Sequence, residues 1–451
     1  MVWISIIIAV FIIGYLCIVF EHPLKINKAA SALLIGAMTW GFLAISDLNP
    51  LDYLVGDGAW QDYLRELSLT EPTSKLKEAS LLHHLADIAS ILFFLMGAMA
   101  IVELIDLHDG FHIITSKIKT TDKRVLLWLV CGITFFLSAI LDNLTTSIVM
   151  ASLLRKLIEG KYARMIYAGM VIIAANAGGA FSPIGDITTT MLWIGGQITS
   201  MNIITGLFIP SVVAILVPLL LITFRLRGNF SKPLEKTEFI TTKTERTAVL
   251  VAGVSALIFV PIFKTVTHLP PFMGMFFGLG VMWIITEILH KSKDIEEKSK
   301  YSAIKALSKI DTSSVLFFFG ILAGIACLET IGQLHNLAEL LNTHIGNEDL
   351  IAITIGLLSA IVDNVPLVAA SMGMYDIAAT GTMATDGKFW ELIAFCAGTG
   401  GSTLIIGSAA GVAVMGIEKI DFIWYLKKIG GLALAGYLSG VAVFLAGYYW
   451  F

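Results

Sequence analysis

Leu137-Ser-Ala-Ile-Leu-Asp-Asn143 is repeated as Leu358-Ser-Ala-Ile-Val-Asp-Asn364, and this duplication is the strongest indication of the fold. Each copy is followed, after almost the same number of residues, by a glycine-rich segment. The first runs from Gly178-Gly179 to Gly185-Asp186, and the second from Gly400-Gly401 to Gly407-Ser408. A duplicated Asp-Asn pair followed by a duplicated glycine-rich break, in apolar surroundings, is typical of a membrane protein built from two structural repeats.

Composition indicates that the chain lies in a membrane. Of its 451 residues, 57% are hydrophobic and 14% are charged, whereas soluble proteins carry roughly a quarter charged residues. Apolar runs of about 20 residues, the length that crosses a bilayer, recur along the chain. We therefore expect an all-α polytopic membrane protein in contact with lipid, with residues 1–20 as a true span rather than a signal peptide. The net charge of −4 gives no indication of a nucleic-acid partner.

Loop charge predicts the orientation, because Lys and Arg collect in cytoplasmic loops. Loops that are acidic or poor in basic residues lie at 47–82, 333–349 and 376–388, and basic segments lie at 21–28, 117–124, 155–164, 225–246, 291–309 and 427–428. This pattern places both termini outside the cytoplasm.

Segment 125–154 begins and ends at basic loops, so both of its ends should face the cytoplasm. About 30 residues cannot make two full crossings, which need roughly 40, so we expect a re-entrant hairpin with Asp142-Asn143 at its tip. The second copy, at about 350–375, begins and ends at acidic loops and has Asp363-Asn364-Val365-Pro366 at its tip. Two hairpins that enter from opposite faces predict inverted-topology repeats. The alternative is two ordinary short spans in each segment.

A helix interrupted by glycine should follow each hairpin, at about 165–199 and about 390–419. Gly and Pro weaken a helix, and unwound backbone inside a membrane is tolerated where it lines a cavity or is buried in protein. The sequence thus predicts about ten transmembrane helices, two opposed hairpins and two interrupted helices. The first repeat covers 1–224, a cytoplasmic linker covers 225–248, and the second repeat covers 249–451.

The predicted tips and breaks bring together polar side chains that share one property: they are carboxylates, amides and hydroxyls. They are Asp142, Asn143, Thr145, Thr146, Asn176, Ser182, Asp186, Thr188, Thr189, Asp363, Asn364, Thr399, Ser402, Thr403 and Ser408. Such oxygens are the ligands of hard cations such as Na⁺ or Li⁺. Because the set holds no Lys, Arg or His, it favours a cation over an anion.

The acids Asp142, Asp186 and Asp363 require a reason to lie in the membrane, where one Asp costs about 2.5–3.5 kcal/mol. Such a carboxylate can hold a proton or a sodium ion, but not both at once. We expect Asp142 and Asp186 to be the principal shared carriers, with Asp363 as the third acid of a Na⁺ site. Ser408 stands where the first half has Asp186, so the halves should contribute unequally.

Simpler roles are open for several of these residues. Asn143 and Asn364 could cap helix ends, and the threonines could cap a helix or bond to their own helix backbone. Glu103 and Glu329 end corresponding apolar runs, and are either interfacial residues or a route for protons. The pair His83-His84 could sense pH or lie at the membrane interface without such a role.

At these motifs the chain resembles the NhaD-type sodium/proton antiporters of the ion transporter superfamily. The resemblance rests on Leu141–Thr146, Gly178–Thr189, Val362–Pro366 and Gly400–Ser408, and spans essentially the whole chain. It implies exchange of Na⁺ or Li⁺ for H⁺ by alternating access in a bacterial inner membrane, useful at alkaline pH, with no cofactor. It also implies a dimerising scaffold domain and a moving transport domain, hence a homodimer. The site residues it implies are Asp142, Asn176, Asp186, Thr188, Thr189, Asp363 and Ser408.

Two rival functions follow from the same residues. The superfamily also contains citrate, dicarboxylate and arsenite carriers, so fold alone does not identify the substrate. An intramembrane aspartyl protease pairs an Asp with a Gly-x-Gly-Asp sequence, which Ile184-Gly185-Asp186 approaches. Pro183 stands where the first glycine belongs, and a protease leaves the second copy of each motif unexplained.

Overall fold

The computed structural model describes residues 2–54, 59–115, 118, 120–230, 241–291 and 293–450. These residues are mostly helical and form no strand, apart from an isolated bridge between Asp122 and Asn229. Ten helices among them are long and apolar enough to cross a membrane. The prediction of an all-α polytopic membrane protein with about ten transmembrane helices is confirmed.

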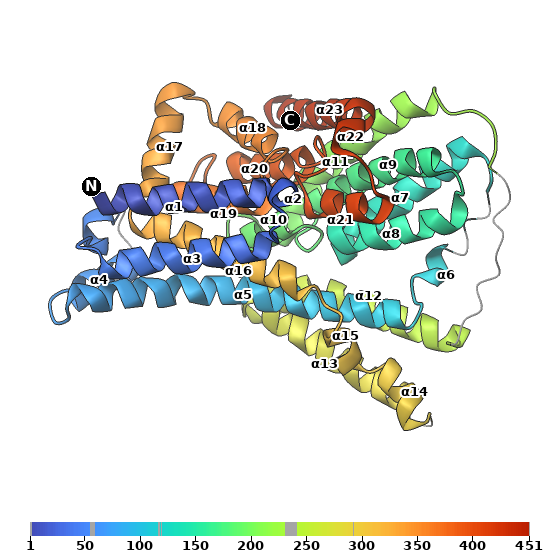
Figure 1. Ribbon diagram of the computed structural model, residues 1–451, viewed down its shortest axis with the longest axis horizontal. Helices are drawn as coiled ribbons and strands as arrows, with labels where there is room; N and C mark the ends of the chain where they lie inside the picture. Colours follow the sequence, from blue (N-terminus) through green and yellow to red (C-terminus); the bar gives the residue numbers. More distant parts are fainter. Residues whose placement is uncertain are drawn as a thin grey trace. The chain divides into compact units, whose positions relative to one another are not determined.

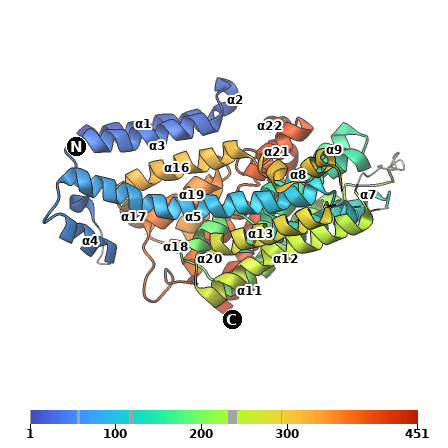
Figure 2. The ribbon, with the colours of Figure 1, turned by 90° about the horizontal axis from the view of Figure 1, so that it is seen from below.

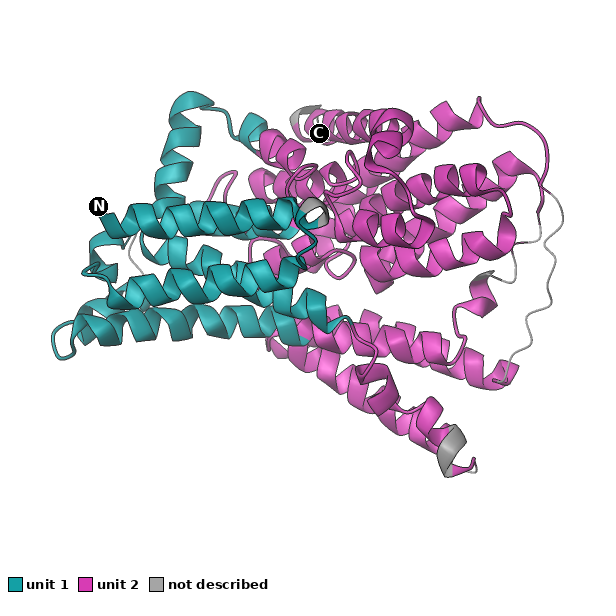
Figure 3. Ribbon diagram, viewed as in Figure 1, with its two compact units in different colours: residues 1–93, 311–351, 365–378 teal, residues 94–310, 352–364, 379–451 magenta. Residues whose placement is uncertain are grey.

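The chain forms two compact units, each of which combines segments from both halves of the sequence (Figure 3). Unit 1 comprises residues 1–93, 311–351 and 365–378, and unit 2 comprises residues 94–310, 352–364 and 379–451. Three helices cross this division and contribute to both units: α5 (Thr73–Leu107), α18 (Glu348–Leu358) and α19 (Asn364–Met374).

Unit 1 is centred on α3, which packs against α1 and α16 (Figure 1). Small residues let two of these backbones approach closely: a Cβ on Gly320 of α16 would lie 2.4 Å from the backbone of Ala32 in α3. The indole nitrogen of Trp40 in α3 donates to the carbonyl of Ala323, 2.8 Å away. The elements that lie wholly in unit 1 are α1 (Val2–Val19), α2 (Glu21–Leu24), α3 (Lys28–Ile45), η1 (Pro50–Tyr53), α4 (Ala59–Leu67), α16 (Thr312–Thr330) and α17 (Gln333–His344).

Unit 2 contains the residues predicted to bind ions. Its first half supplies α6 (His112–Thr115), α7 (Lys123–Leu141), α8 (Asn143–Leu157), α9 (Lys161–Ala180), α10 (Ile187–Ile194), α11 (Ser200–Thr223), α12 (Lys243–Thr267), α13 (Pro271–Leu289), α14 (Ile295–Lys300) and α15 (Ala303–Leu307). The second half supplies α20 (Lys388–Gly400), α21 (Ala409–Glu418), α22 (Phe422–Tyr425), the π-helix η2 (Leu426–Gly430) and α23 (Gly431–Trp450).

Helix α9 is at the centre of unit 2, in contact with α7, α8, α11, α20 and α21 (Figures 1 and 2). Most of α9 is buried and rich in Ala and Gly, and these small residues let the neighbouring helices pack closely against it. Helix α11 packs against α23, and α12 against α13. Of the predicted linker 225–248, residues 231–240 lie outside the described residues, and α12 begins at Lys243.

Where the first hairpin is predicted, α7 and α8 pack against each other and are joined by Asp142 alone. Helix α7 is one of the ten helices long enough to cross a membrane, so re-entry stays a prediction. In the second hairpin region, α18 and α19 are separated by residues 359–363. Entry from opposite faces and inverted repeats stay predictions.

Both helices predicted to be interrupted are broken where the glycines lie. Helix α9 ends at Ala180 and α10 begins at Ile187, while α20 ends at Gly400 and α21 begins at Ala409. A Cβ on Gly178 would lie 2.1 Å from the Phe135 carbonyl oxygen, and one on Gly400 would lie 2.0 Å from that of Gly356. Each interrupted helix therefore touches the first helix of the preceding hairpin region, α7 or α18, backbone to backbone.

Candidate ion-binding site

Asp142 lies at the joint between α7 and α8. Its backbone has φ 90° and ψ 156°, a region that non-glycine residues avoid at a cost of about 1–3 kcal/mol. Its carboxylate accepts hydrogen bonds at 2.8 Å from both the backbone nitrogen and the hydroxyl of Thr145. Asp142 therefore caps α8, and Thr145 serves it as a partner.

Asp186 has the same role in the first interrupted helix. It is 2% exposed, and its Oδ1 accepts from the Thr188 backbone nitrogen at 3.0 Å and hydroxyl at 2.9 Å. It thus caps α10, whose N-terminus favours a negative charge. The hydroxyl of Thr189 donates to the carbonyls of Ser182 and Asp186, so this threonine bonds to nearby backbone.

Asn143 connects the hairpin tip to the interrupted helix. Its amide nitrogen lies 2.5 Å from Asp186 Oδ2 and 3.0 Å from Asn176 Oδ1. These contacts make Asn143 a bridging amide, a role that the sequence did not suggest, and its part in ion binding stays a prediction. One oxygen of Asp186 is bound by the α10 N-terminus and the other by the hairpin.

Asn176 extends the network into the second half of the sequence. Its amide nitrogen donates to the hydroxyls of Ser402 at 2.9 Å and Ser408 at 3.0 Å, both in the second break. Ser408 caps α21 with φ −144° and ψ 151°, almost the backbone angles of Asp186 at −145° and 146°. The two breaks therefore share one geometry but carry different side chains.

The third predicted acid, Asp363, is near enough for its charge to act on Asp186, as is Asp142. The three carboxylates are not grouped in the way that would hold a metal ion by themselves, so a Na⁺ site formed by all three stays a prediction. Among the described residues, several buried polar atoms have no protein hydrogen-bond partner, and three of them belong to predicted site residues. These are the hydroxyls of Thr146 and Thr403 and the amide nitrogen of Asn364.

Two further predicted residues make structural contacts. The Ser182 hydroxyl donates to the Ala139 carbonyl at 2.5 Å, which links the first break to α7. The Thr399 hydroxyl donates to the Phe395 carbonyl at 2.6 Å within α20. Both hydroxyl protons are thus engaged by backbone, although each oxygen keeps lone pairs that could face a cation.

Glu103 and Glu329 have different surroundings. Glu103 of α5 forms an ion pair with Lys309 at 3.0 Å in unit 2. Glu329 of α16 lines a cavity of about 240 Å³ in unit 1, together with His83, His84 and Asp376. Glu103 and Glu329 therefore occupy corresponding positions in the sequence but have different neighbours in the structure.

Sequence reasoning missed the serines of the duplicated motif. Ser138 donates to the Ala175 carbonyl at 2.6 Å, and Ser359 to the Ala397 carbonyl at 3.2 Å. Each serine therefore links its hairpin region to the helix that ends at the break, α9 or α20. Their signal was in the sequence, since both serines stand four residues before the duplicated Asp.

An ion-paired cluster was also missed. Glu418, whose side chain is fully buried at the end of α21, pairs with Arg155 at 2.8 Å and Arg164 at 2.6 Å. These arginines belong to α8 and α9, so one carboxylate joins three helices. The sequence showed the arginines only as a basic loop.

No group of three or more His, Cys, Asp or Glu side chains arranged to hold a metal ion occurs in the described part of the chain. The partners of Asp142 and Asp186 are hydroxyls, amides and backbone N–H groups. A cation cargo bound here would therefore draw on hydroxyl, amide and carbonyl oxygens besides the carboxylates.

This fold and site define a class: a polytopic membrane protein with two interrupted helices that meet at buried polar groups. The chain matches the family described as CitMHS, citrate transporter, over residues 1–390. It belongs to that family of the ion transporter superfamily.

The chain is also similar to individual proteins over nearly its whole length. It is 47% identical to sodium/proton antiporter 1 of Arabidopsis thaliana over 96% of this chain and 71% of that protein. It is 28% identical to the Na⁺/H⁺ antiporter NhaD of Alkalimonas amylolytica over 97% of this chain and 89% of that one. The expected resemblance to NhaD-type proteins is confirmed.

A solved structure shows the same fold. The crystal structure of the YdaH transporter of Alcanivorax borkumensis matches with a TM-score of 0.57 at 11% identity. The match covers 97% of this chain and 99% of that one.

Proposed function

We propose that this protein is a secondary antiporter that exchanges Na⁺ for H⁺. The observation that carries the proposal is the pair of carboxylates at the α7–α8 joint and at the first helix break: Asp186 is buried and Asp142 half-buried, and hydroxyl, amide and backbone N–H groups donate to both. The similarity to proteins named sodium/proton antiporters supports the choice of cargo.

The mechanism is competition for the carboxylates. A proton on Asp186 or Asp142 removes the charge that holds Na⁺, and Na⁺ displaces the proton, so the two cargoes alternate. Alternating access then moves the loaded site from one face of the membrane to the other. Li⁺ is the second cation that the site would accept, because it prefers the same oxygen ligands.

Further parts of the proposal rest on loop charge, on the duplicated motifs and on the resemblance to NhaD-type antiporters. We place the protein in the inner membrane of a bacterial-type cell, with both termini outside the cytoplasm, as a homodimer of inverted repeats. A role in pH homeostasis would follow from the exchange itself.

The first test is transport by the variants Asp142→Asn and Asp186→Asn in proteoliposomes. Asn is as good an N-cap as Asp, so both variants should keep the caps of α8 and α10 while losing the charge. We expect Na⁺-dependent proton flux to fall at least about tenfold, the effect of roughly 1.4 kcal/mol. Asp122→Asn, a cap at the start of α7, is the matched control and should transport normally. Exchange at the wild-type rate in both site variants would refute the assignment.

One second candidate has an observation in its favour: the matching family is described as a citrate transporter. The same proteoliposomes therefore receive Na⁺, Li⁺, K⁺ and citrate in turn. Proton flux with Na⁺ or Li⁺ but not citrate supports the antiporter. Flux that requires citrate would replace it with an organic-anion carrier.

A further inference from the structure

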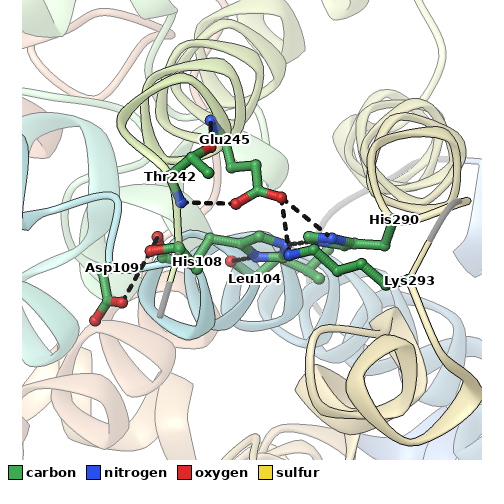
Figure 4. A network of polar contacts seen from close by, with 8 residues as sticks. Leu104, His108, Asp109, Thr242, Glu245, His290 and Lys293 are labelled. Atoms are coloured by element: carbon green, nitrogen blue, oxygen red, sulfur yellow. Dashed lines mark hydrogen bonds and ion pairs between the residues drawn. The ribbon is translucent and has the colours of Figure 1, made fainter. Parts of the chain in front are cut away.

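A second buried polar cluster lies at the ends of three helices of unit 2 (Figure 4). His108 directly follows α5, His290 directly follows α13, and Glu245 lies in the first turn of α12. The two histidines are 0% and 1% exposed, and none of the contacts of the candidate ion site involves them.

The positions of the ring protons follow from the partners. His108 Nδ1 lies 2.7 Å from the Leu104 carbonyl oxygen, which can only accept, so Nδ1 carries a proton. In a neutral ring the other nitrogen is then an acceptor. His108 Nε2 lies 2.8 Å from His290 Nε2, so His290 donates from that atom.

This arrangement places an acceptor nitrogen, His290 Nδ1, near an acceptor oxygen, Glu245 Oε1. A neutral His290 that donates from Nε2 has a lone pair on Nδ1, and Nδ1 has no hydrogen-bond partner among the described residues. Glu245 Oε1, another atom that can only accept, lies 3.7 Å from it. A proton on Nδ1 would turn this unfavourable pair of acceptors into an ion pair.

In the structure, Lys293 is the cation that pairs with the Glu245 carboxylate. Its Nζ lies 2.8 Å from the same Oε1 of Glu245, while Glu245 Oε2 accepts from the Thr242 backbone nitrogen at 2.7 Å. The second contact belongs to the capping box of α12. Oε1 can therefore exchange its cationic partner while Oε2 keeps the helix capped.

Burial and the charges of Lys293 and His108 lower the pKa of His290 to about 4, against the opposing charges of Glu245 and Glu287. Burial also lowers the pKa of His108, against its bond to Leu104 and the charges of Glu245 and Asp109. The ring of Tyr301 stacks on that of His290 at 5.1 Å and lies tilted against that of His108 at 5.3 Å. Both imidazoles are therefore neutral at neutral pH, and His290 binds its proton only in acid.

A metal ion fits this pair less well than a proton. Two imidazole nitrogens bound to one tetrahedral zinc ion at about 2.0–2.1 Å stand roughly 3.3 Å apart. The observed 2.8 Å is instead the length of a direct hydrogen bond between the rings.

We propose that His290 Nδ1 is a proton-binding site at which a bound proton competes with the Lys293 ammonium for the Glu245 carboxylate. Acidification would exchange Lys293 for His290 at the start of α12. Near its other end, α12 carries Lys264, which donates to the Trp193 carbonyl at 2.5 Å. Trp193 lies in the last turn of α10, the helix that begins after Asp186. The effect on transport, which rests on the proposed function, would therefore pass through α12 and α10.

Proton binding is tested on the purified full chain by its melting temperature between about pH 4 and 8. The folded state holds the His290 proton more weakly than the unfolded chain, where the pKa is 6.5. Stability contributed by neutral His290 is therefore present above pH 6.5 and declines as the pH falls toward about 4. His290→Gln should remove this share of the acid destabilisation. Lys293→Gln should reduce it, because the proton then binds more tightly.

The matched control is Lys298→Gln, which removes a lysine that pairs with Glu287 rather than Glu245. It should keep the wild-type dependence on pH. A His290→Gln curve that parallels the wild type, or a Lys293→Gln curve that coincides with Lys298→Gln, would overturn the proposal.

A separate measurement follows transport against pH in proteoliposomes. Lys293→Gln should shift the acid limb of the profile to higher pH, by roughly one unit if the charge pair is worth about 1.4 kcal/mol. His290→Gln should abolish that shift in the double variant. Absence of exchange in the wild type would count against the proposed function alone, because the melting curves decide the proton site independently. Exchange with an unshifted acid limb would overturn the link to transport.

Discussion

At the residue scale, the candidate site is a chain of side-chain contacts from Asp186 through Asn143 and Asn176 to Ser402 and Ser408. Every link is buried, so each lost partner leaves a group that water does not solvate. Such an orphan costs about 1–3 kcal/mol, more when it is charged. The network therefore holds the carboxylate in one orientation.

Asn143→Ala tests that role. We expect it to lower the melting temperature and the transport rate, because Asp186 and Asn176 both lose a buried donor. The matched control is Asn364→Ala at the equivalent position of the second motif copy, whose amide nitrogen has no partner among the described residues. It should cost less stability than Asn143→Ala. Equal losses of stability in the two variants would contradict the bridging role.

The sequence singled out Asp142, Asp363 and Asn143 because they belong to the duplicated motif. It did not identify the partners of Glu418, since Arg155 and Arg164 stand 263 and 254 residues away and no local pattern records such a distance. It left the role of Asn143 open for the same reason. Whether an amide caps a helix or bridges to a carboxylate depends on how the neighbouring helices pack.

At the scale of elements, the glycines set how closely each interrupted helix approaches the first helix of the preceding hairpin region, α7 or α18. Hydrophobic length and glycine spacing predicted these helices to within a few residues of their observed ends. The close contacts at Gly178 and Gly400 could not be predicted from spacing alone. They depend on the carbonyls of Phe135 and Gly356, which only the packed structure brings near.

Gly178→Ala and Gly400→Ala should both destabilise the protein, because the added methyl group would overlap a backbone carbonyl that cannot rotate away. Overpacking of this kind costs about 1–3 kcal/mol or more. Gly132→Ala in α7 is the control, since a Cβ there meets nothing within 4 Å and Ala favours a helix. Melting temperatures of the three variants decide the point. A melting temperature of Gly178→Ala at or above that of Gly132→Ala would contradict the close contact.

At the scale of the whole molecule, the two compact units do not follow the two halves of the sequence. The duplicated motifs therefore divide the sequence into two halves, whereas each compact unit contains segments of both halves. The inverted arrangement of the repeats is a prediction about the membrane, and labelling of exposed positions tests it directly.

Single cysteines are introduced into a chain whose own cysteines, Cys17, Cys131, Cys327 and Cys396, are replaced. Arg124→Cys and Lys156→Cys, at the two ends of the α7–α8 pair, should react with an impermeant maleimide from one face of the membrane. Asn347→Cys and Asp376→Cys, around the second hairpin region, should react from the other face. All four reacting from one face, or either pair divided between faces, would rule out opposed hairpins.

The backbone contact at Gly178 and Gly400 also limits how such a protein can evolve. Neither position tolerates a larger residue unless a neighbouring helix moves. Single substitutions at these two glycines would therefore disrupt the shape of the breaks. Adaptation to a new cargo must therefore proceed through the few side chains that border the gap. Related carriers would then differ in their hydroxyls, amides and acids while keeping the same path of the chain.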